Sequence, residues 1–224
     1  MKYKSFESTY SYEFLSNIDC DLHHKMLDKY FEIFGDITIG DLVFFDIGCN
    51  AGSFLKATSN YSKLIEFHCF EPHPELYDFL SKSYSKYRIN NMCVSDYDGF
   101  CIINIPSISV GISSIIDRDV FDKLKEDQEI YRLDVECTTI DSYCLKNNIE
   151  QIDYIKIDVE GAEYMVLCGC MEMLSNGKIK AGQFEVGIEK EIGISIDKIV
   201  SLLNEYGYIV CTELETDYFF YKKQ

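Results

Sequence analysis

The chain has 224 residues, 47% of them hydrophobic, and a formal net charge of −17. Its length suits one domain, or one domain with a small extension. The negative charge disfavours direct binding to nucleic acid and to acidic membrane surfaces. No stretch approaches the roughly 18–20 apolar residues of a membrane span, and the N-terminus lacks the apolar core of a signal peptide. We therefore expect a cytoplasmic protein without a membrane span.

Residues 1–40 are predicted to form an N-terminal helical extension, followed by the main domain at residues 41–224. Apolar and aromatic residues recur at steps of three and four, at Leu22, Met26, Leu27, Tyr30, Phe31 and Phe34. This spacing predicts an amphipathic helix that ends at Gly35. The helix is either a lid over an active site or a cap on a sheet edge, and we favour the cap.

The central motif runs from Val43 to Gly52 and reads VFFDIGCNAG. Its apolar start predicts a buried strand of a parallel sheet, which ends at Asp46-Ile47. Gly48 and Gly52 allow a sharp turn and a close approach of a ligand to the backbone, and Asn50 tolerates the left-handed region. With a short helix predicted at 53–58, this strand, loop and helix form the nucleotide-binding corner of a doubly wound α/β sheet.

The glycine spacing indicates which nucleotide is bound. A dinucleotide fingerprint requires G-x-G-x-x-G, but Asn50 and Ser53 stand at its second and third glycine positions. No lysine directly follows Gly52, as a P-loop would require. The remaining pattern, D-x-G-x-N-x-G, resembles the S-adenosylmethionine loop of class I methyltransferases. The alternative is an ordinary turn between a strand and a helix.

Glu71 follows the next apolar run, Ile65 to Phe70, and lies 25 residues after Asp46. Nucleotide-binding folds place an acid at about this spacing, where it binds the ribose. A carboxylate can accept hydrogen bonds from both ribose hydroxyls at once. We therefore predict that Glu71 binds a ribose, in preference to being a solvated acid at a strand end.

A third strand is predicted at 89–94 and leads into Ser95 and Asp96. Folds of this kind place the residues at that point beside the adenine. Further strands are predicted at 100–105 and 133–137. The polar residues 107–131 are predicted to form an insert that faces the acceptor.

Three carboxylates follow the apolar run that begins at Tyr154, at Asp158, Glu160 and Glu163. They stand at the carboxyl end of a predicted strand, where open α/β sheets bind ligands, and crowded acids raise one another's pKa, as a catalytic base requires. Asp158 and Glu160 are therefore our candidate bases, with Glu185, predicted to face inward, behind them. For Glu163 we favour a structural role at a helix N-terminus.

A metal is the alternative use for these carboxylates, because Mg²⁺ prefers oxygen ligands. We favour a site without metal. The ten cysteines include no C-x-x-C pair, and several lie in apolar runs, so we expect free thiols rather than a metal centre.

The C-terminal part is predicted to contain one helix from 162 to 176, a strand at 183–186, an amphipathic helix around 196–203, and strands at 208–211 and 218–221. The last two strands predict an antiparallel hairpin. Class I methyltransferases add such a hairpin to a Rossmann sheet, and dehydrogenases generally lack it.

In order and spacing, four motifs resemble those of the FkbM-type methyltransferases. They are Asp46-Ile-Gly48-Cys-Asn50-Ala-Gly52, Phe70-Glu71-Pro72-His73-Pro74, Ile157-Asp158-Val159-Glu160-Gly161-Ala162-Glu163 and Phe184-Glu185. The resemblance covers roughly residues 40–190, and the third motif is the most specific. It implies a Rossmann-like, mostly parallel seven-stranded sheet with a C-terminal antiparallel hairpin.

The resemblance also implies S-adenosylmethionine-dependent methylation of a hydroxyl on a sugar, a glycan or another small molecule. Asp46 and the backbone of the Gly48–Gly52 loop would then hold the methionine part of the donor, Glu71 the ribose, and Ser95 or Asp96 the adenine. Two other functions stay open: a catalytically silent interaction module with this fold, and a nicotinamide-dependent oxidoreductase. The sequence does not identify the acceptor or the oligomeric state.

Overall fold

The computed structural model describes residues 20–35, 42–59, 65–106, 113–116, 130–186, 196–212 and 216–223. The first 19 residues of the predicted extension and most of the predicted 107–131 insert lie outside this set. Within it, no helix combines the length and the apolar character needed to cross a membrane.

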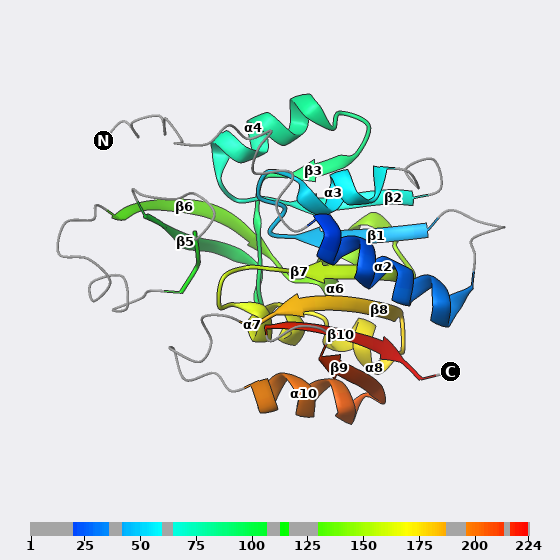
Figure 1. The fold of residues 1–224 in the computed structure, drawn as a ribbon. Coiled ribbons are helices and arrows are strands. Elements are labelled where there is room, and N and C mark those ends of the chain that lie inside the picture. Colours follow the sequence, from blue (N-terminus) through cyan, green and yellow to red (C-terminus); the bar gives the residue numbers. More distant parts are fainter. Residues whose placement is uncertain are drawn as a thin grey trace.

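A seven-stranded, mostly parallel sheet forms the centre of the molecule (Figure 1). Its strands, in spatial order, are β3 (Arg88–Asn90), β2 (Ile65–Phe70), β1 (Leu42–Ile47), β7 (Ile152–Ile157), β8 (Ile179–Glu185), β10 (Asp217–Lys222) and β9 (Tyr208–Thr212). β10 runs antiparallel to both of its neighbours, while the other described pairings in this sheet are parallel. The predicted fold class, including the C-terminal antiparallel hairpin, is confirmed.

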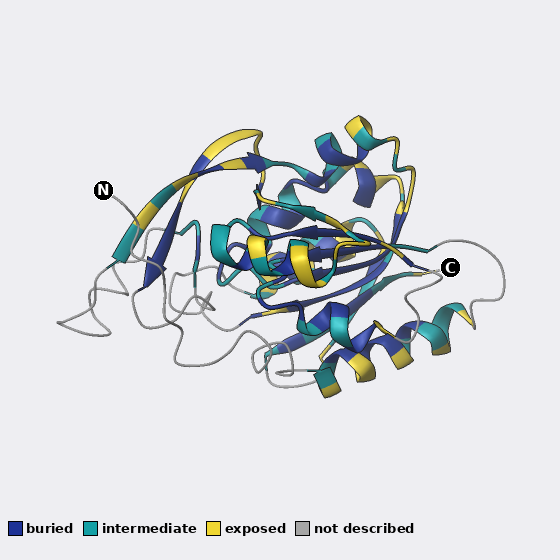
Figure 2. Cartoon of the chain, turned by 90° about the horizontal axis from the view of Figure 1, so that it is seen from above, coloured by how far each residue is buried: buried dark blue, intermediate teal, exposed yellow. Residues whose placement is uncertain are grey.

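Helices cover both faces of this sheet. On one face lie α2 (Cys20–Phe34), α3 (Ser53–Ala57) and α4 (Pro74–Ser83), and on the other lie α6 (Ile140–Asn147), α7 (Glu163–Cys168), α8 (Met171–Ser175) and α10 (Ile196–Glu205). Figure 2 shows the buried strands between helices that are buried on one side and exposed on the other. β7 is buried at all six positions, because it lies in the middle of the sheet and is covered on both faces.

α2 is the helix predicted from the spacing in the N-terminal extension. Its Tyr30 ring packs against Phe44 of β1 and Tyr154 of β7, with ring centroids 5.9 and 5.6 Å apart. Each such side chain, when fully buried, contributes about 2 kcal/mol to stability. β1 and β7 are central strands, so the prediction that this helix caps a sheet edge is wrong: its apolar face is wide enough to cover the middle of the sheet (Figure 1).

The predicted third strand is divided between two sheets. β3 ends at Asn90 in the large sheet, and β4 (Cys93–Val94) joins β6 (Ile130–Thr138) and β5 (Gly99–Pro106) in a three-stranded sheet. The side chain of Asn91 donates to the carbonyls of Glu71 and Pro72, at 2.9 and 3.0 Å, where the chain leaves the first sheet. In Figure 1 the β5–β6 hairpin projects beyond the large sheet.

The predicted helix from 162 to 176 is also divided, into α7 and α8. The break lies at Gly169, where an added Cβ would stand 2.1 Å from the carbonyl oxygen of Ser95. The backbone after β4 therefore passes directly against this helix. Asp141 caps α8, because its carboxylate accepts the N–H groups of Glu172 and Met173 at 2.8 and 3.0 Å.

Candidate active site

The loop after β1 has the backbone that its sequence requires. Gly48, Asn50 and Gly52 have φ values of 78°, 47° and 84°. A Cβ at Gly48 would lie 1.8 Å from the carbonyl oxygen of Asp158, so a side chain is excluded there. The loop returns to β2, where Phe70 accepts the N–H of Gly48 at 3.0 Å. The carboxyl ends of β1, β2 and β7 consequently meet at this turn.

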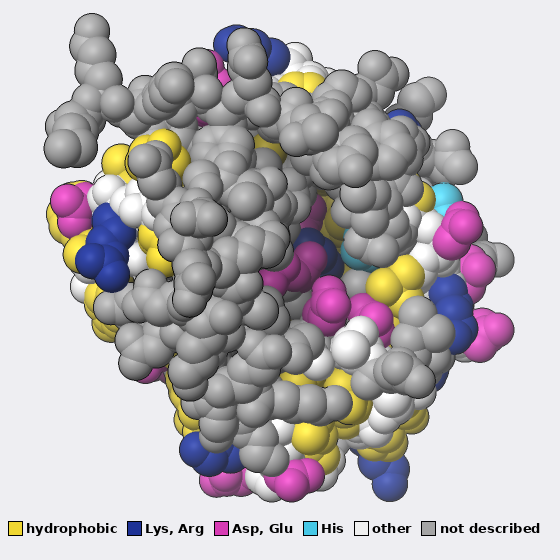
Figure 3. All heavy atoms as spheres, turned by 60° about the vertical axis from the view of Figure 1, so that its left-hand side comes forward, with side chains coloured by type: hydrophobic (Ala, Val, Ile, Leu, Met, Phe, Trp, Pro, Cys, Tyr) yellow, Lys and Arg dark blue, Asp and Glu magenta, His cyan; other side chains and the backbone are white. Residues whose placement is uncertain are grey.

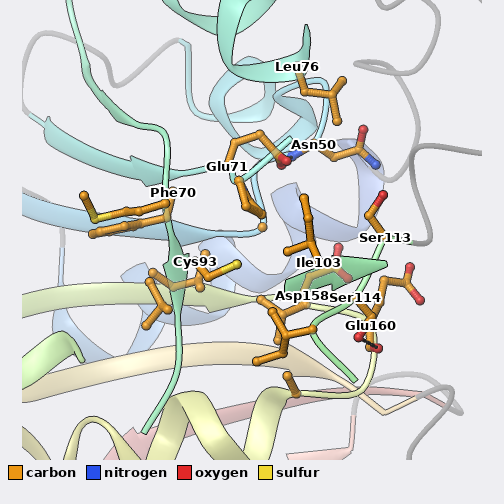
Figure 4. A pocket seen from close by; sticks show the side chains of 18 residues that line it. Asn50, Phe70, Glu71, Leu76, Cys93, Ile103, Ser113, Ser114, Asp158 and Glu160 are labelled. Atoms are coloured by element: carbon orange, nitrogen blue, oxygen red, sulfur yellow. Dashed lines mark hydrogen bonds between the residues drawn. The ribbon is translucent and has the colours of Figure 1, made fainter. Parts of the chain in front are cut away.

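Glu71 fixes the other side of the same turn. It is 5% exposed, and its two carboxylate oxygens accept the N–H groups of Asn50 and His73, each at 2.8 Å. Burial raises the pKa of Glu71 to about 7, although these two hydrogen bonds oppose the shift. The carboxylate thus connects the glycine loop to the end of β2, and in Figure 4 it lies beside Asn50.

A pocket opens between this loop and the small sheet; we call it the loop pocket. Its lining comes from several elements: Ile47, Gly48, Asn50, Phe70, Glu71, Pro72, Leu76, Met92, Cys93, Val94, Ile103, Ser113, Ser114, Ile115, Asp158, Val159, Glu160 and Ala162. Figure 4 shows the Glu71 and Asn50 side chains at one end of it, and Asp158 and Glu160 at another. The pocket therefore has polar groups from the loops that follow β1, β2 and β7 and from Ser113 and Ser114, while β4 and β5 contribute apolar walls.

The oxygens of this pocket suit a ligand that carries hydrogen-bond donors. Asn50 Oδ1 is buried and accepts no hydrogen bond from the described part of the chain. A buried acceptor of this kind is normally satisfied, so a donor group on a ligand would remove an unfavourable contact. Each Glu71 oxygen holds one N–H and keeps a second lone pair. These acceptors fit a ligand with hydroxyl groups, such as a ribose.

Ser95 and Asp96 do not line the loop pocket. Ser95 is fully buried, its N–H donates to Thr138 at 3.0 Å, and its carbonyl faces Gly169. Asp96 is exposed. Their assignment to an adenine stays a prediction. The residues of this segment that do line the pocket, Met92 to Val94, come just before them, where the chain crosses between the two sheets.

The loop that carries Asp158 and Glu160 is held by its neighbours. The Glu163 carboxylate accepts the N–H of Val159 at 2.8 Å and that of Gly161 at 3.0 Å. Ser114 Oγ donates to the Glu160 carbonyl at 2.8 Å. Glu160 itself has a φ of 57°, in the left-handed region. Glu163 therefore orders the backbone at the start of α7, which is the structural role expected for it.

The three candidate bases are divided between two cavities. Asp158 and Glu160 line the loop pocket, while Asp158 and Glu185 line a second cavity. This second cavity, which we call the polar cavity, is lined by Leu22, His23, Lys156, Ile157, Asp158, Gln183, Glu185, Thr216 and Asp217. Figure 3 shows acidic side chains gathered around a hollow on this face. Asp158 borders both spaces.

Glu185 does not face inward as the sequence predicted, because it is exposed at the end of β8. The strand alternates at this point, so the buried neighbour Phe184 takes the core position and Glu185 points to the opposite side. Its place on the polar cavity follows from that orientation.

Lys156 is the main residue of the site that sequence reasoning missed. It is 3% exposed, and its ammonium lies 2.8 Å from the carbonyl of Gly48, 3.1 Å from Asp158 Oδ2 and 3.5 Å from Asp46 Oδ1. Burial lowers the pKa of Lys156, but the charges of Asp158 and Asp46 outweigh it and raise the pKa overall. The available signal was a lysine between Ile155 and Ile157 at the end of a predicted buried strand, since such a charge requires a partner.

His23 brings α2 into the polar cavity. Its Nδ1 accepts from the Gln183 amide at 3.2 Å, and its Nε2 lies 3.1 Å from Ser53 Oγ at the start of α3. Gln183 in turn accepts from the Tyr154 hydroxyl at 2.9 Å. Burial, with a smaller contribution from Lys156, lowers the pKa of His23 to about 3, so the imidazole is neutral and both ring nitrogens are engaged.

The candidate bases do not form a compact metal-binding group. Across the described ranges, three His, Cys, Asp or Glu ligand atoms lie within 4.8 Å of one another in one group, Asp46, Cys49 and Cys69. This group is buried beneath the glycine loop, next to the Lys156 ammonium, whose charge opposes that of a cation.

The sequence matches the Methyltransferase FkbM domain family over residues 46–210. It is also 31% identical over 147 residues to 2-O-methyltransferase NoeI of Sinorhizobium fredii (strain NBRC 101917 / NGR234). That alignment covers 60% of this chain and 60% of NoeI, so the chain spans less than two thirds of the length of this curated relative.

A solved methyltransferase domain has a similar fold. The methyltransferase domain of METTL16 aligns with a TM-score of 0.50 at 12% identity, over 91% of this chain and 68% of that one. A precorrin-6y C5,15-methyltransferase from Geobacter metallireducens GS-15 aligns with a TM-score of 0.48 at 12% identity, over 91% and 88%. The METTL16 similarity concerns the architecture alone.

Proposed function

The chain belongs to the FkbM methyltransferase family, and from this membership we propose that it transfers a methyl group from S-adenosylmethionine to a hydroxyl oxygen of a sugar or another small hydroxylated acceptor. One observation carries the proposal: the buried carboxylate of Glu71 lines a pocket together with a glycine loop that excludes a side chain at Gly48. The similarity to NoeI, a 2-O-methyltransferase, supports oxygen as the atom methylated.

The residues of the loop pocket fit the donor in chemical type. Glu71 would accept hydrogen bonds from the ribose hydroxyls, and the backbone of the Gly48–Gly52 loop would hold the methionine part, with Asp46 beneath it. The adenine would lie between the walls from β4 and β5. Ser95 and Asp96, the residues predicted to bind it, directly follow β4 in the chain but are not part of the pocket lining. When bound, S-adenosylmethionine supplies a methyl group activated by its sulfonium.

Asp158 is the first candidate for binding the acceptor, because it borders both the loop pocket and the polar cavity. In the proposed reaction a bond forms between the acceptor oxygen and the methyl carbon while the carbon–sulfur bond breaks. The hydroxyl proton passes to a carboxylate, for which we propose Asp158 ahead of Glu160 and Glu185. Most of the acceleration would come from holding oxygen, carbon and sulfur in line.

Calorimetric titration with S-adenosylmethionine, S-adenosylhomocysteine and NADH tests the donor assignment. We expect micromolar binding of both sulfur ligands and none of NADH. Binding of neither sulfur ligand would overturn the proposal and favour a catalytically silent module, while binding of NADH alone would favour an oxidoreductase. A panel of free sugars and glycosides, with mass detection of a methylated product, then tests the acceptor class.

The Asp158→Asn variant tests the proposed base. We expect turnover to fall at least a hundredfold, because a general base contributes about 10²–10⁴ in rate, while S-adenosylmethionine binding persists. Glu160→Gln is the matched comparison and tests the second candidate base, which lines the same pocket but not the polar cavity; we expect a smaller loss of turnover from it. Retained turnover in Asp158→Asn would remove this residue from the chemistry.

A further inference from the structure

A row of polar residues crosses the centre of the sheet beneath the glycine loop. Asp46 of β1, Lys156 of β7 and Gln183 of β8 are register partners on adjacent parallel strands, so their side chains project from the same face. Two residues earlier on each strand, and therefore on the same face, Phe44, Tyr154 and Ala181 form an apolar layer. The polar row is therefore built into the sheet at its ligand-binding edge.

The Lys156 ammonium connects three separate segments of the chain. It donates to the Gly48 carbonyl in the loop after β1, at 2.8 Å. It forms ion pairs with Asp158 beyond the end of β7, at 3.1 Å, and with Asp46 inside β1, at 3.5 Å. An ammonium has three N–H groups, so one side chain can face all three partners at once.

Asp46 depends on this lysine. It is fully buried, and neither of its carboxylate oxygens has a well-formed hydrogen bond within the ranges described. Burial raises the pKa of Asp46, and Lys156 is the main group that opposes the shift. Asp46, Asp158 and Lys156 together carry a formal charge of −1, which complements one positive charge on a ligand.

We propose that Lys156 is a positioning residue of the donor site. Its ammonium fixes the Gly48 carbonyl and the Asp158 carboxylate relative to each other. The donor-binding loop and the acid that contacts the acceptor are thereby held at a constant distance and orientation. This inference rests on the proposed function. Lys156 lines the polar cavity but is absent from the lining of the loop pocket, so it acts through Gly48 and Asp158.

The decisive variant is the double substitution D46N/K156M. It removes the ammonium and its three contacts but leaves the formal charge of the three positions at −1, so a change in affinity reports position rather than charge. It also avoids the unpaired buried carboxylate of K156M alone, which endangers folding. D46N alone is the reference for any effect of Asp46 itself, and K156R is the conservative variant.

Lys180→Met is the matched control. Lys180 forms an ion pair with Asp153 at 2.6 Å on the neighbouring strand, and it lines neither cavity. Its loss removes a lysine–aspartate pair of the same sheet without touching the loop. Thermal unfolding of each variant, measured beside the titrations, separates a loss of affinity from a loss of folded protein.

Calorimetric titration with S-adenosylmethionine and S-adenosylhomocysteine gives the readout. We expect D46N/K156M to bind both ligands at least tenfold more weakly than the native chain, which has the same formal charge at the three positions, and more weakly than D46N. K156R should retain most of the native affinity, and K180M should match the native chain. Equal affinities in the native chain and D46N/K156M would overturn the positioning role. If the native chain binds neither ligand, the proposed function fails instead, and the two failures are thereby distinct.

Discussion

Replacing Glu71 with glutamine should change how the stability of the protein depends on pH. The pKa of Glu71 rises from its usual 4.5 to about 7, chiefly through burial. Between these values the unfolded chain has lost this proton while the folded chain still holds it. Folding stability from this group is therefore fully present below pH 4.5 and is lost as the pH rises through 7.

The size of the effect follows from the pKa difference. At about 1.4 kcal/mol for each pH unit, the rise from 4.5 to about 7 corresponds to about 3.5 kcal/mol over the whole range, of which about 2.5 kcal/mol falls between pH 5 and pH 8. Glutamine is neutral throughout, so this dependence is absent from the variant. The native free energy of unfolding minus that of Glu71→Gln should thus decrease by about 2.5 kcal/mol over this interval.

Equilibrium urea unfolding at pH 5, 6, 7 and 8 measures this difference, and other titrating groups cancel because both proteins share them. Glu136→Gln, on an exposed position of β6, is the control for a change of one carboxylate. A difference that stays constant to within about 0.5 kcal/mol would refute the reasoning, because it would mean that Glu71 ionises equally easily in the folded and unfolded chains.

Three further predictions concern the loop, α2 and metals. Gly48→Ala should bind S-adenosylmethionine at least tenfold more weakly by calorimetry and should lose about 2 kcal/mol or more of stability. Gly35→Ala, at a φ of 83° with open space around it, should show only the backbone cost of about 1 kcal/mol. Equal losses of stability in the two variants would contradict the overlap between a Cβ at residue 48 and the Asp158 carbonyl. His23→Ala should weaken donor binding and lower the melting temperature more than His24→Ala does. His23 joins α2 to both Ser53 and Gln183, whereas His24 contacts one carbonyl of α3. Similar donor affinities in the two variants would exclude a role of His23 in supporting the donor site. Treatment with EDTA should leave methyl transfer unchanged in a product assay, and loss of activity that Mg²⁺ restores would require a metal in the reaction.

Local sequence determined the individual elements with good accuracy. Apolar runs predicted β1, β2 and β7, because a strand covered on both faces needs apolar residues throughout. The positive φ values of Gly48 and Gly52 follow from residues that lack a Cβ. These features depend on a few neighbouring residues, which the sequence displays directly.

The sequence also indicated the edge of the sheet at which a site would form. Gly48, Asn50, Glu71, Asp158 and Glu160 were expected at the carboxyl ends of strands, and all five line the loop pocket. Parallel strands bring their carboxyl ends to one edge whatever their order, so a rule about strand ends is enough to gather these residues. The same rule could not divide the acids between two cavities, since that division depends on which face each side chain takes.

Only the tertiary structure decided how distant segments meet. The pairing of Lys156 with Asp46 depends on the register between β1 and β7, which are separated by more than 100 residues in the chain. The break at Gly169 depends on the close approach of Ser95, and the position of α2 over the sheet centre depends on the Tyr30 contacts with both central strands. Propensity and spacing determine what each segment becomes, whereas register and packing determine which charges meet, and in this protein those charges hold the site together.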